Sequence, residues 1–235
     1  MSFSQNFKQS KFGFTLAEIL ITLAIIGIVA AMTLPMLFGS IQKKQTIAKL
    51  QKAISEINQA YKLSIDQNGG GSAEEFLNMG AKEYFKKFWQ PYLKIVTYCE
   101  DYKQCGYQNN RPYYILKGNL LGSDLIAGSS RIAFITMDGF IFNIRTSEWD
   151  TDNNTGFTKT AGTFIIDLNG SKGPNMIGKD VFMLTRNEDG TEIIPKCKDT
   201  PTAQVNNNCS HAGSGECCAE KIRRAGWKID SSYPW

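Results

Sequence analysis

Residues 11–35 read KFGFTLAEILITLAIIGIVAAMTLP. From Phe14 to Phe38 the chain is mostly apolar and carries one charged residue, Glu18. An α-helix rises about 1.5 Å per residue, so a segment of this length crosses roughly 30 Å of hydrocarbon with some tilt. This stretch therefore predicts a membrane-spanning helix with a carboxylate close to its start.

The apolar pattern changes beyond the span but does not stop. Pro35 and Gly39 are the strong helix breakers between the two parts, and a proline within a helix usually bends it without ending it. We therefore expect one helix of about 50 residues that ends at Asn68, where glycines follow. Its second half has one apolar stripe, with apolar residues at spacings of three and four: Ile47, Leu50, Ile54, Ile57, Tyr61 and Ile65.

The remainder predicts a second helix and an antiparallel sheet. Ser72 and Glu75 form a capping-box pattern before an aromatic-rich segment that Pro91 ends. Residues 131–145 alternate around Asp138-Gly139, which is typical of a tight hairpin. Residues 163–168, 181–185 and 191–194 are further expected strands, rich in β-branched or aromatic residues. The fold class is therefore α+β.

Six cysteines lie beyond the span: Cys99, Cys105, Cys197, Cys209, Cys217 and Cys218. If that side is exported, oxidation to disulfides is expected. Cys99 and Cys105 are close enough in sequence to close a small loop, and the other four allow three pairings. The adjacent Cys217 and Cys218 are expected to pair with different partners, because disulfide geometry is demanding. The tail after Pro195 is expected to be a stapled loop over the sheet.

Composition fits one membrane segment and one domain. The chain has 235 residues, 42% of them hydrophobic, which leaves enough sequence for one compact core. The formal net charge is +4, and Lys8 and Lys11 precede the span, so the remainder carries 4 − 2 = +2. This balance does not indicate a polyanionic partner. Lys43 and Lys44 follow the span, so charge alone leaves its orientation undecided.

The segment around Gly13 resembles the prepilin signature of type IV pilins and type II secretion pseudopilins. That signature is a short basic leader, a glycine, then Phe-Thr-Leu-x-Glu opening a long apolar helix, and here it reads Lys11-Phe12-Gly13 followed by Phe14-Thr15-Leu16-Ala17-Glu18. In the family, a membrane-embedded prepilin peptidase cuts after the glycine and methylates the new N-terminal phenylalanine. The resemblance implies cleavage between Gly13 and Phe14. Glu18 then becomes the fifth mature residue and Pro35 the twenty-second, where family members carry these residue types.

The resemblance also implies an organisation and a function. The organisation is a leader at 1–13, a transmembrane and assembly helix segment at 14–38, and an exported globular domain at 39–235 that includes the amphipathic half of the helix. The implied fold is pilin-like, with the long helix packed on a small antiparallel sheet and a disulfide-bearing C-terminal region. The implied function is a structural subunit of a type IV pilus or type II secretion pseudopilus, not an enzyme.

The expected partners follow from that function. They are prepilin peptidase, other pilin or pseudopilin subunits, the inner-membrane assembly platform and the membrane itself. We expect a single-pass protein of the cytoplasmic membrane whose C-terminal domain lies outside the cytoplasm, and a cell-surface or periplasmic fibre after assembly.

Glu18 needs a physical reason to lie in lipid. A charged side chain near the bilayer centre costs on the order of 2.5–3.5 kcal/mol on insertion scales, so it needs a partner or a proton. Cleavage would free the α-amino group of Phe14, which in a fibre could meet Glu18 of a neighbouring copy and set the register while apolar contacts hold the bundle. The alternative is that Glu18 lies near the interface and its charge reaches water.

Two other functions remain open. A permanently anchored, single-span extracytoplasmic binding protein would not polymerise and would not depend on Glu18. A secreted domain would be cut near Val29-Ala30-Ala31, which suits a signal peptidase. The apolar run continues past Ala31 to Phe38, and secretory apolar segments are usually only about 7–15 residues long.

A calcium site is a further candidate, because related pseudopilins can hold calcium in a loop near the last strands. Asp167, Asn169 and Asp180 offer oxygen ligands in a segment resembling that region. An EF-hand that began at Asp167 would place Gly178 where glutamate is needed, and a glycine-proline turn with Asx caps explains the same residues. The loop 150–156 also has alternating acidic residues, but its glycine comes one residue late.

The C-terminal region offers no clear chemistry. His211 is the only histidine, and the sequence shows no Ser-His-Asp arrangement, Walker loop or regularly spaced zinc ligands around it. A basic cluster of Lys221, Arg223, Arg224 and Lys228 could contact DNA, as some pilins do during uptake. A solvated helix face explains the cluster equally well, so a nucleic-acid partner has no further support.

Overall fold

The computed structural model describes residues 13–69, 79–122, 131–145, 163–187 and 189–235. The chain divides into two compact units, Met1–Lys43 and Lys44–Trp235. Helix α1 (Leu16–Asn68) is a single helix of 53 residues that belongs to both units. Pro35 lies within it without ending it, so the prediction of one long N-terminal helix is confirmed.

The second unit contains an antiparallel sheet whose strands follow one another in chain order. Among the described residues the sheet has six strands: β1 (Ile95–Cys99), β2 (Arg131–Thr136), β3 (Ile141–Arg145), β4 (Thr163–Asp167), β5 (Val181–Arg186) and β6 (Ile193–Pro195). The predicted hairpin at Asp138-Gly139 joins β2 to β3, and Gly139 adopts a positive φ of 79° that glycine tolerates well. Strand β1, at one edge, was not predicted from the sequence.

Short helices surround the sheet. Helix α3 (Ala81–Phe88) and the 3₁₀ turn η1 (Gln90–Tyr92) precede β1, so the second predicted helix ends before Pro91 as expected. The capping pattern at Ser72 and Glu75 lies outside the described residues. The prediction of a stapled loop for the tail needs correction, because α4 (Thr202–Asn208) and α5 (Cys218–Arg224) form there.

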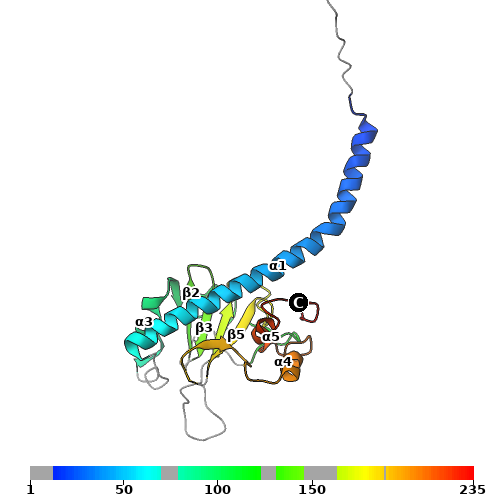
Figure 1. The fold of residues 1–235 in the computed structure, drawn as a ribbon. Coiled ribbons are helices and arrows are strands. Elements are labelled where there is room, and N and C mark those ends of the chain that lie inside the picture. The colour runs from blue at the N-terminus through cyan, green and yellow to red at the C-terminus, as the bar shows by residue number, and fades with distance from the viewer. Residues whose placement is uncertain (1–12, 70–78, 123–130, 146–162, 188) are drawn as a thin grey trace, which may run out of the picture. The chain divides into compact units, whose positions relative to one another are not determined.

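Both faces of the sheet are buried. Successive strand residues point to opposite sides, and consecutive residues of β3 and β4 are buried. On one face, the second half of α1 crosses the strands (Figure 1), and its residues Leu50, Ile57 and Tyr61 pack with Phe134 and Phe164. The opposite face has its own smaller apolar cluster, which contains Ile165, Met183 and the tyrosines Tyr107 and Tyr113. A residue placed on either face of a central strand is therefore enclosed.

Asn58 joins α1 to the β6 edge of the sheet. Its Nδ2 donates to the carbonyl of Ile193 at 2.7 Å, and its Oδ1 accepts from the backbone N–H of Ile193 at 2.8 Å. The amide thus satisfies both backbone groups of one edge residue, as a further strand would. This pair of hydrogen bonds fixes the position of the helix against the sheet.

Three disulfides staple the second unit. They join Cys99 to Cys105, Cys197 to Cys217, and Cys209 to Cys218. The adjacent Cys217 and Cys218 therefore pair with different partners, as the sequence indicated. Cys209 follows α4 and Cys218 begins α5, and both are fully buried in the main core, so their bond joins the two C-terminal helices within that core.

Candidate functional site

The bond between Gly13 and Phe14 lies just before α1, in chain without regular secondary structure. Neither residue is helical, and the helix begins at Leu16. The Phe14 side chain is 84% exposed, and a Cβ added at Gly13 would meet nothing within 4 Å. A protease can therefore reach this bond without unfolding the helix.

Thr15 and Glu18 form a capping box at the start of α1. The Glu18 Oε2 atom accepts from the Thr15 backbone N–H at 2.8 Å and from the Thr15 hydroxyl at 2.9 Å. In return, the Glu18 backbone N–H donates to Thr15 Oγ1 at 3.3 Å. This reciprocal pattern satisfies N–H groups that a helix start leaves without partners.

The box uses only one oxygen of the Glu18 carboxylate. Both Thr15 donors meet Oε2, and among the described residues no donor meets Oε1. The negative charge also lies in the first turn, where the positive end of the helix dipole favours it. Glu18 can therefore stabilise its own helix start and still accept a hydrogen bond from a second group.

The sequence contained the signal for this box. Thr15-Leu16-Ala17-Glu18 matches the same Ser/Thr-x-x-Glu pattern as Ser72 and Glu75. The resemblance alone assigns no capping role to Thr15. The structure adds it to the functional residues.

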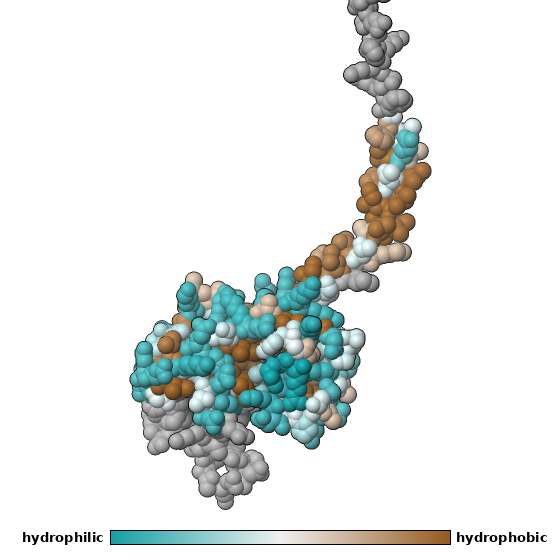
Figure 2. Space-filling view, viewed as in Figure 1, coloured by the Kyte–Doolittle hydropathy of each residue, from teal (hydrophilic) through white to brown (hydrophobic). Residues whose placement is uncertain are grey.

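The N-terminal half of α1 presents apolar side chains to its surroundings. It contains a segment long and apolar enough to cross a membrane, with none of that segment buried inside the protein. Figure 2 shows a mostly hydrophobic surface along this part of the helix. Its exposed large residues include Leu20, Leu23, Ile26 and Val29. Such a surface requires lipid or other apolar helices as its environment.

The candidate calcium residues lie at the end of β4 and in the turn before β5. Asp167 is fully buried, and its Oδ2 accepts from the Tyr107 hydroxyl at 2.7 Å. Tyr113 is 3.2 Å from the Tyr107 oxygen, so the acid ends a buried chain of hydroxyl groups. Burial raises the pKa of Asp167 to about 8, and burial likewise raises the pKa of both tyrosines.

Asp180 is held by amide donors. Its Oδ1 accepts from the backbone N–H of Met176 at 2.7 Å, and its Oδ2 accepts from that of Asn175 at 2.9 Å and from Asn169 Nδ2 at 3.2 Å. Burial raises the pKa of this carboxyl. The turn is therefore closed by hydrogen bonds from its own backbone.

This arrangement does not favour calcium. Calcium takes six to eight oxygen ligands, whereas the oxygens of both aspartates already accept from protein donors. In this turn, the buried side-chain oxygens left without a partner are those of two amides, Asn169 Oδ1 and Asn175 Oδ1. No group of three or more His, Cys, Asp or Glu side chains in the described residues is arranged for a metal. The alternative loop at 150–156 lies outside the described residues.

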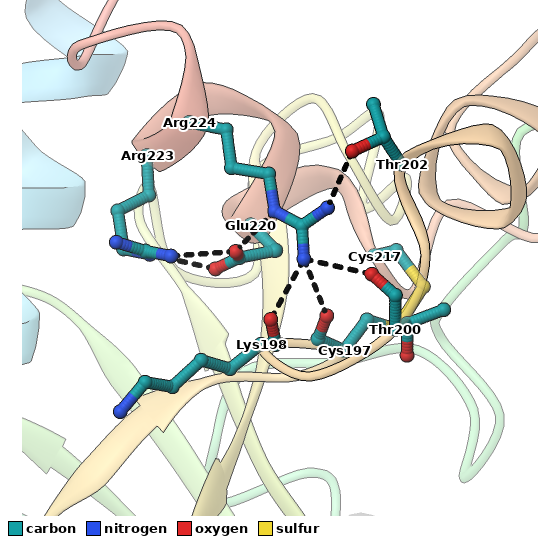
Figure 3. Close-up of polar contacts among 8 residues, drawn as sticks. All are labelled: Cys197, Lys198, Thr200, Thr202, Cys217, Glu220, Arg223 and Arg224. Atoms are coloured by element: carbon teal, nitrogen blue, oxygen red, sulfur yellow. Dashed lines mark hydrogen bonds and ion pairs between the residues drawn. A yellow bond between two sulfur atoms is a disulfide. The ribbon is translucent and has the colours of Figure 1, made fainter.

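Three members of the basic cluster, Lys221, Arg223 and Arg224, lie on α5 and are engaged within the protein, and Lys228 lies beyond the helix and is exposed. Arg223 and Arg224 both converge on Glu220, which is fully buried, with nitrogen–oxygen distances of 2.6–2.7 Å (Figure 3). The Glu220 carboxylate raises the pKa of the Arg223 guanidinium. Lys221 donates to the carbonyls of Cys209 and Ser232. These contacts give the cluster a structural use and do not support a DNA surface.

Arg224 also clamps the loop that follows β6. Its guanidinium reaches the carbonyls of Lys198 at 2.7 Å and Thr200 at 2.8 Å, and the Thr202 hydroxyl at 3.2 Å. Figure 3 shows this contact set beside the Cys197–Cys217 disulfide. The disulfide and the arginine therefore fix the same loop from two sides.

Comparison with known proteins identifies the N-terminal segment. Residues 8–34 match the family model described as the prokaryotic N-terminal methylation motif. The match includes Gly13, Phe14, Thr15 and Glu18 and the apolar half of α1 up to Leu34. Among curated proteins and among solved structures, nothing matches the chain.

Proposed function

We propose that this prepilin-like member of the type IV pilin and pseudopilin family is cleaved between Gly13 and Phe14, N-methylated at Phe14, and assembled through α1 into a type IV pilus or type II secretion pseudopilus. The observation that carries the proposal is the methylation motif at 8–34 on a helix with an exposed scissile bond and a capped, charged first turn. In this function the chain is a substrate of prepilin peptidase and a building unit, and it performs no chemistry itself.

The geometry of Glu18 supports a role in assembly. A carboxylate within lipid is costly, and the two Thr15 hydrogen bonds reduce that cost in the unassembled subunit. The remaining Oε1 can accept from the new α-amino group of an adjoining copy. A charge-assisted hydrogen bond of this kind fixes register, while the apolar surface of the helix supplies the contact area.

Processing is tested first. The protein is isolated from membranes of cells with and without prepilin peptidase, and its N-terminus is determined by mass spectrometry. We expect N-methylated Phe14 as the first residue only when the peptidase is present. An N-terminus that stays at Met1, or that begins near Met32, would contradict the proposal.

Assembly is tested with Glu18→Gln. Glutamine can take the place of glutamate in a capping box but carries no charge, so this variant separates the cap from the charge. We expect normal cleavage and at least a tenfold loss of the protein from sheared fibres, since tenfold corresponds to about 1.4 kcal/mol. The matched variant Thr15→Val removes the two hydrogen bonds of the Thr15 hydroxyl and keeps the Glu18 charge and the backbone hydrogen bond, and it should reduce incorporation less. Equal incorporation of Glu18→Gln and wild type would favour a permanently anchored protein that does not polymerise.

A further inference from the structure

A groove beside Trp227 lies between α1 and the C-terminal region, next to the β6 edge of the sheet. It consists of two cavities, of about 380 Å³ and about 250 Å³, that share Ile54, Glu192 and Trp227 in their walls. Side chains of α1 complete the larger cavity, and β6 with Lys198 and Arg223 completes the smaller one. Pockets for small molecules have volumes of about 300–1,000 Å³, so the larger cavity is of ligand size.

Trp227 is held in the groove by an unusual backbone conformation. Its φ is 58°, in the left-handed region that bulky residues rarely adopt. Its backbone N–H donates to the carbonyl of Ile222 at 2.9 Å just beyond α5, and its half-buried side chain packs against the main core. Glycine would adopt this backbone more easily, so the chain keeps a large aromatic side chain at a position that disfavours one. The indole therefore forms a fixed aromatic wall of both cavities.

The larger cavity presents both hydrogen-bond donors and acceptors. Its wall on α1 has four exposed polar side chains that follow one another at spacings of three or four residues: Gln51, Ser55, Gln59 and Lys62. Gln59 Nε2 donates to Ser55 Oγ at 2.9 Å, which leaves the Gln59 carbonyl oxygen to accept. Within the described ranges, the side chains of Gln51, Lys62 and Glu192 have no hydrogen-bond or ion-pair partner in the protein. An amide, an ammonium group and a carboxylate therefore line one cavity and are available to a ligand.

This combination of groups fits a sugar better than an ion or a wholly apolar molecule. Each sugar hydroxyl both donates and accepts, which matches a lining of amide, ammonium and carboxylate groups. The C–H face of a sugar ring is apolar, and packing it on an indole removes apolar surface from water. The Glu192 carboxylate opposes an anion, and Lys62 and Lys198 oppose a metal ion. A ligand with many hydroxyl groups is therefore favoured.

The β6 edge does not suit a peptide as the occupant. An extended peptide binds a sheet edge through main-chain hydrogen bonds. Asn58 already pairs with both the N–H and the carbonyl of Ile193, and Pro195 has no N–H to donate. Strand β6 has only three residues, so little of its edge is left for another strand. The groove must therefore be recognised through its side chains.

We propose that the groove between α1 and β6 binds a saccharide chain, with one sugar ring packed on Trp227 in the larger cavity and the next unit in the smaller one. Gln51, Gln59 and Glu192 form hydrogen bonds with the hydroxyl groups of the first ring. All of these residues belong to the unit Lys44–Trp235, so binding does not depend on cleavage or fibre assembly. Failure of this proposal would leave the proposed function intact.

The test uses the full chain in micelles of a detergent without a sugar headgroup, because a glycosidic detergent would compete for the groove. Binding of maltose, lactose and N,N′-diacetylchitobiose is measured by saturation-transfer-difference NMR and by calorimetry, with tri-alanine as the peptide probe. The aromatic wall is tested with Trp227→Gly, which suits the backbone conformation but removes the ring, and with Trp227→Phe, which keeps an aromatic ring. The polar wall is tested with Gln51→Ala and Glu192→Ala. The control is Gln204→Ala, at an exposed position of α4.

We expect at least one of the three disaccharides to bind wild type and Gln204→Ala with a Kd of about 1 mM or lower. Trp227→Gly should weaken this binding at least tenfold, and Trp227→Phe should stay within about threefold of wild type. Gln51→Ala and Glu192→Ala should each weaken it by about threefold or more, and they test the groove even where Trp227→Gly does not fold. The proposal is overturned if none of the disaccharides binds, or if tri-alanine binds as tightly as they do. Unchanged affinity in a folded Trp227→Gly, or in both polar variants, would also overturn it.

Discussion

The buried acid Asp167 makes stability fall as the pH rises. Its pKa is raised by burial from 3.8 to about 8 in the folded protein. Between those values the folded state keeps a proton that the unfolded state has released, so the folded state binds more protons. Each pH unit in this window then lowers the free energy of unfolding by about 1.4 kcal/mol. The loss of unfolding free energy due to Asp167 is absent below pH 3.8 and reaches its full size above the pKa of the folded state.

The magnitude follows from the shift itself. A difference of 8 − 3.8, or about 4 units, corresponds to roughly 6 kcal/mol as an upper limit. Asp167→Asn removes the titration and keeps an acceptor oxygen and a polar group beside Tyr107. Near pH 5 this variant should be less stable than wild type by about 1 kcal/mol, the value of one altered hydrogen bond. Near pH 9 it should be the more stable protein, so the two curves cross.

The assay is urea unfolding of the full chain in detergent micelles at pH 4 to 9, followed by tryptophan fluorescence, because Trp89 is fully enclosed in the core. Asp66→Asn, at an exposed position of α1, is the control and should leave the slope unchanged. Asp180 and Glu56 also have raised pKa values and contribute slopes of the same sign, so only the difference between wild type and Asp167→Asn is diagnostic. Parallel curves for these two proteins over the whole range would refute the assignment.

Three further predictions concern the second unit. Asn58→Leu should lower the free energy of unfolding of this unit in urea by about 2–4 kcal/mol, because two buried backbone groups of β6 lose their partner. The control Gln59→Leu, at an exposed position, should lower it by less than about 0.5 kcal/mol. Arg224→Lys cannot reproduce the carbonyl contacts, so limited proteolysis should cut the loop after β6 faster than in wild type or in the exposed Lys228→Ala. The thermal unfolding midpoint in calcium should lie within about 1 °C of the midpoint in a chelator, because the Asp180 oxygens already accept from N–H donors. A saturable rise of several degrees would show that the turn rearranges around the ion.

Local patterns predicted most elements of the fold. The α1 helix follows from a long apolar run and then a 3.6-residue stripe, and the β2–β3 hairpin follows from Asp138-Gly139 between alternating segments. These signals depend on neighbours in sequence, so a single chain is enough to read them. Strand β1 has only five residues and no alternation of burial, and its pairing with β2 across a bulge depends on distant residues.

The two helices of the C-terminal tail were not predicted either, because they too depend on contacts between residues distant in sequence. The polar and cysteine-rich composition of the tail carries no helical stripe, yet α4 and α5 form there. Two short helices of seven residues each would not be stable alone. The Cys209–Cys218 bond joins α4 to α5, and the Cys197–Cys217 bond joins the start of α5 to the loop after β6. Helix formation in this region is therefore a consequence of tertiary contacts and could not be derived from periodicity.

The burial of Asp167 follows in part from the sequence. Alternation along 163–167 places Asp167 on the same face as Ile165 and opposite to Ile166. Once β4 is known to lie between two other strands with both faces covered, the acid must be buried. The sequence alone did not show that coverage, so the residue was interpreted as a candidate metal ligand. The hydroxyl partner, Tyr107, is 60 residues away in the chain.

Glu18 has two proposed roles, one before cleavage and one after it. Before cleavage the carboxylate caps α1 through Oε2. Cleavage would then create a positive amine on Phe14 beside the positive end of the helix dipole, which is unfavourable unless a negative charge lies in the first turn. Glutamine preserves the cap but not this compensation. The Glu18→Gln defect must therefore appear after processing and before incorporation, as cleaved subunits that accumulate in the membrane; a defect in cleavage itself would assign Glu18 to peptidase recognition instead.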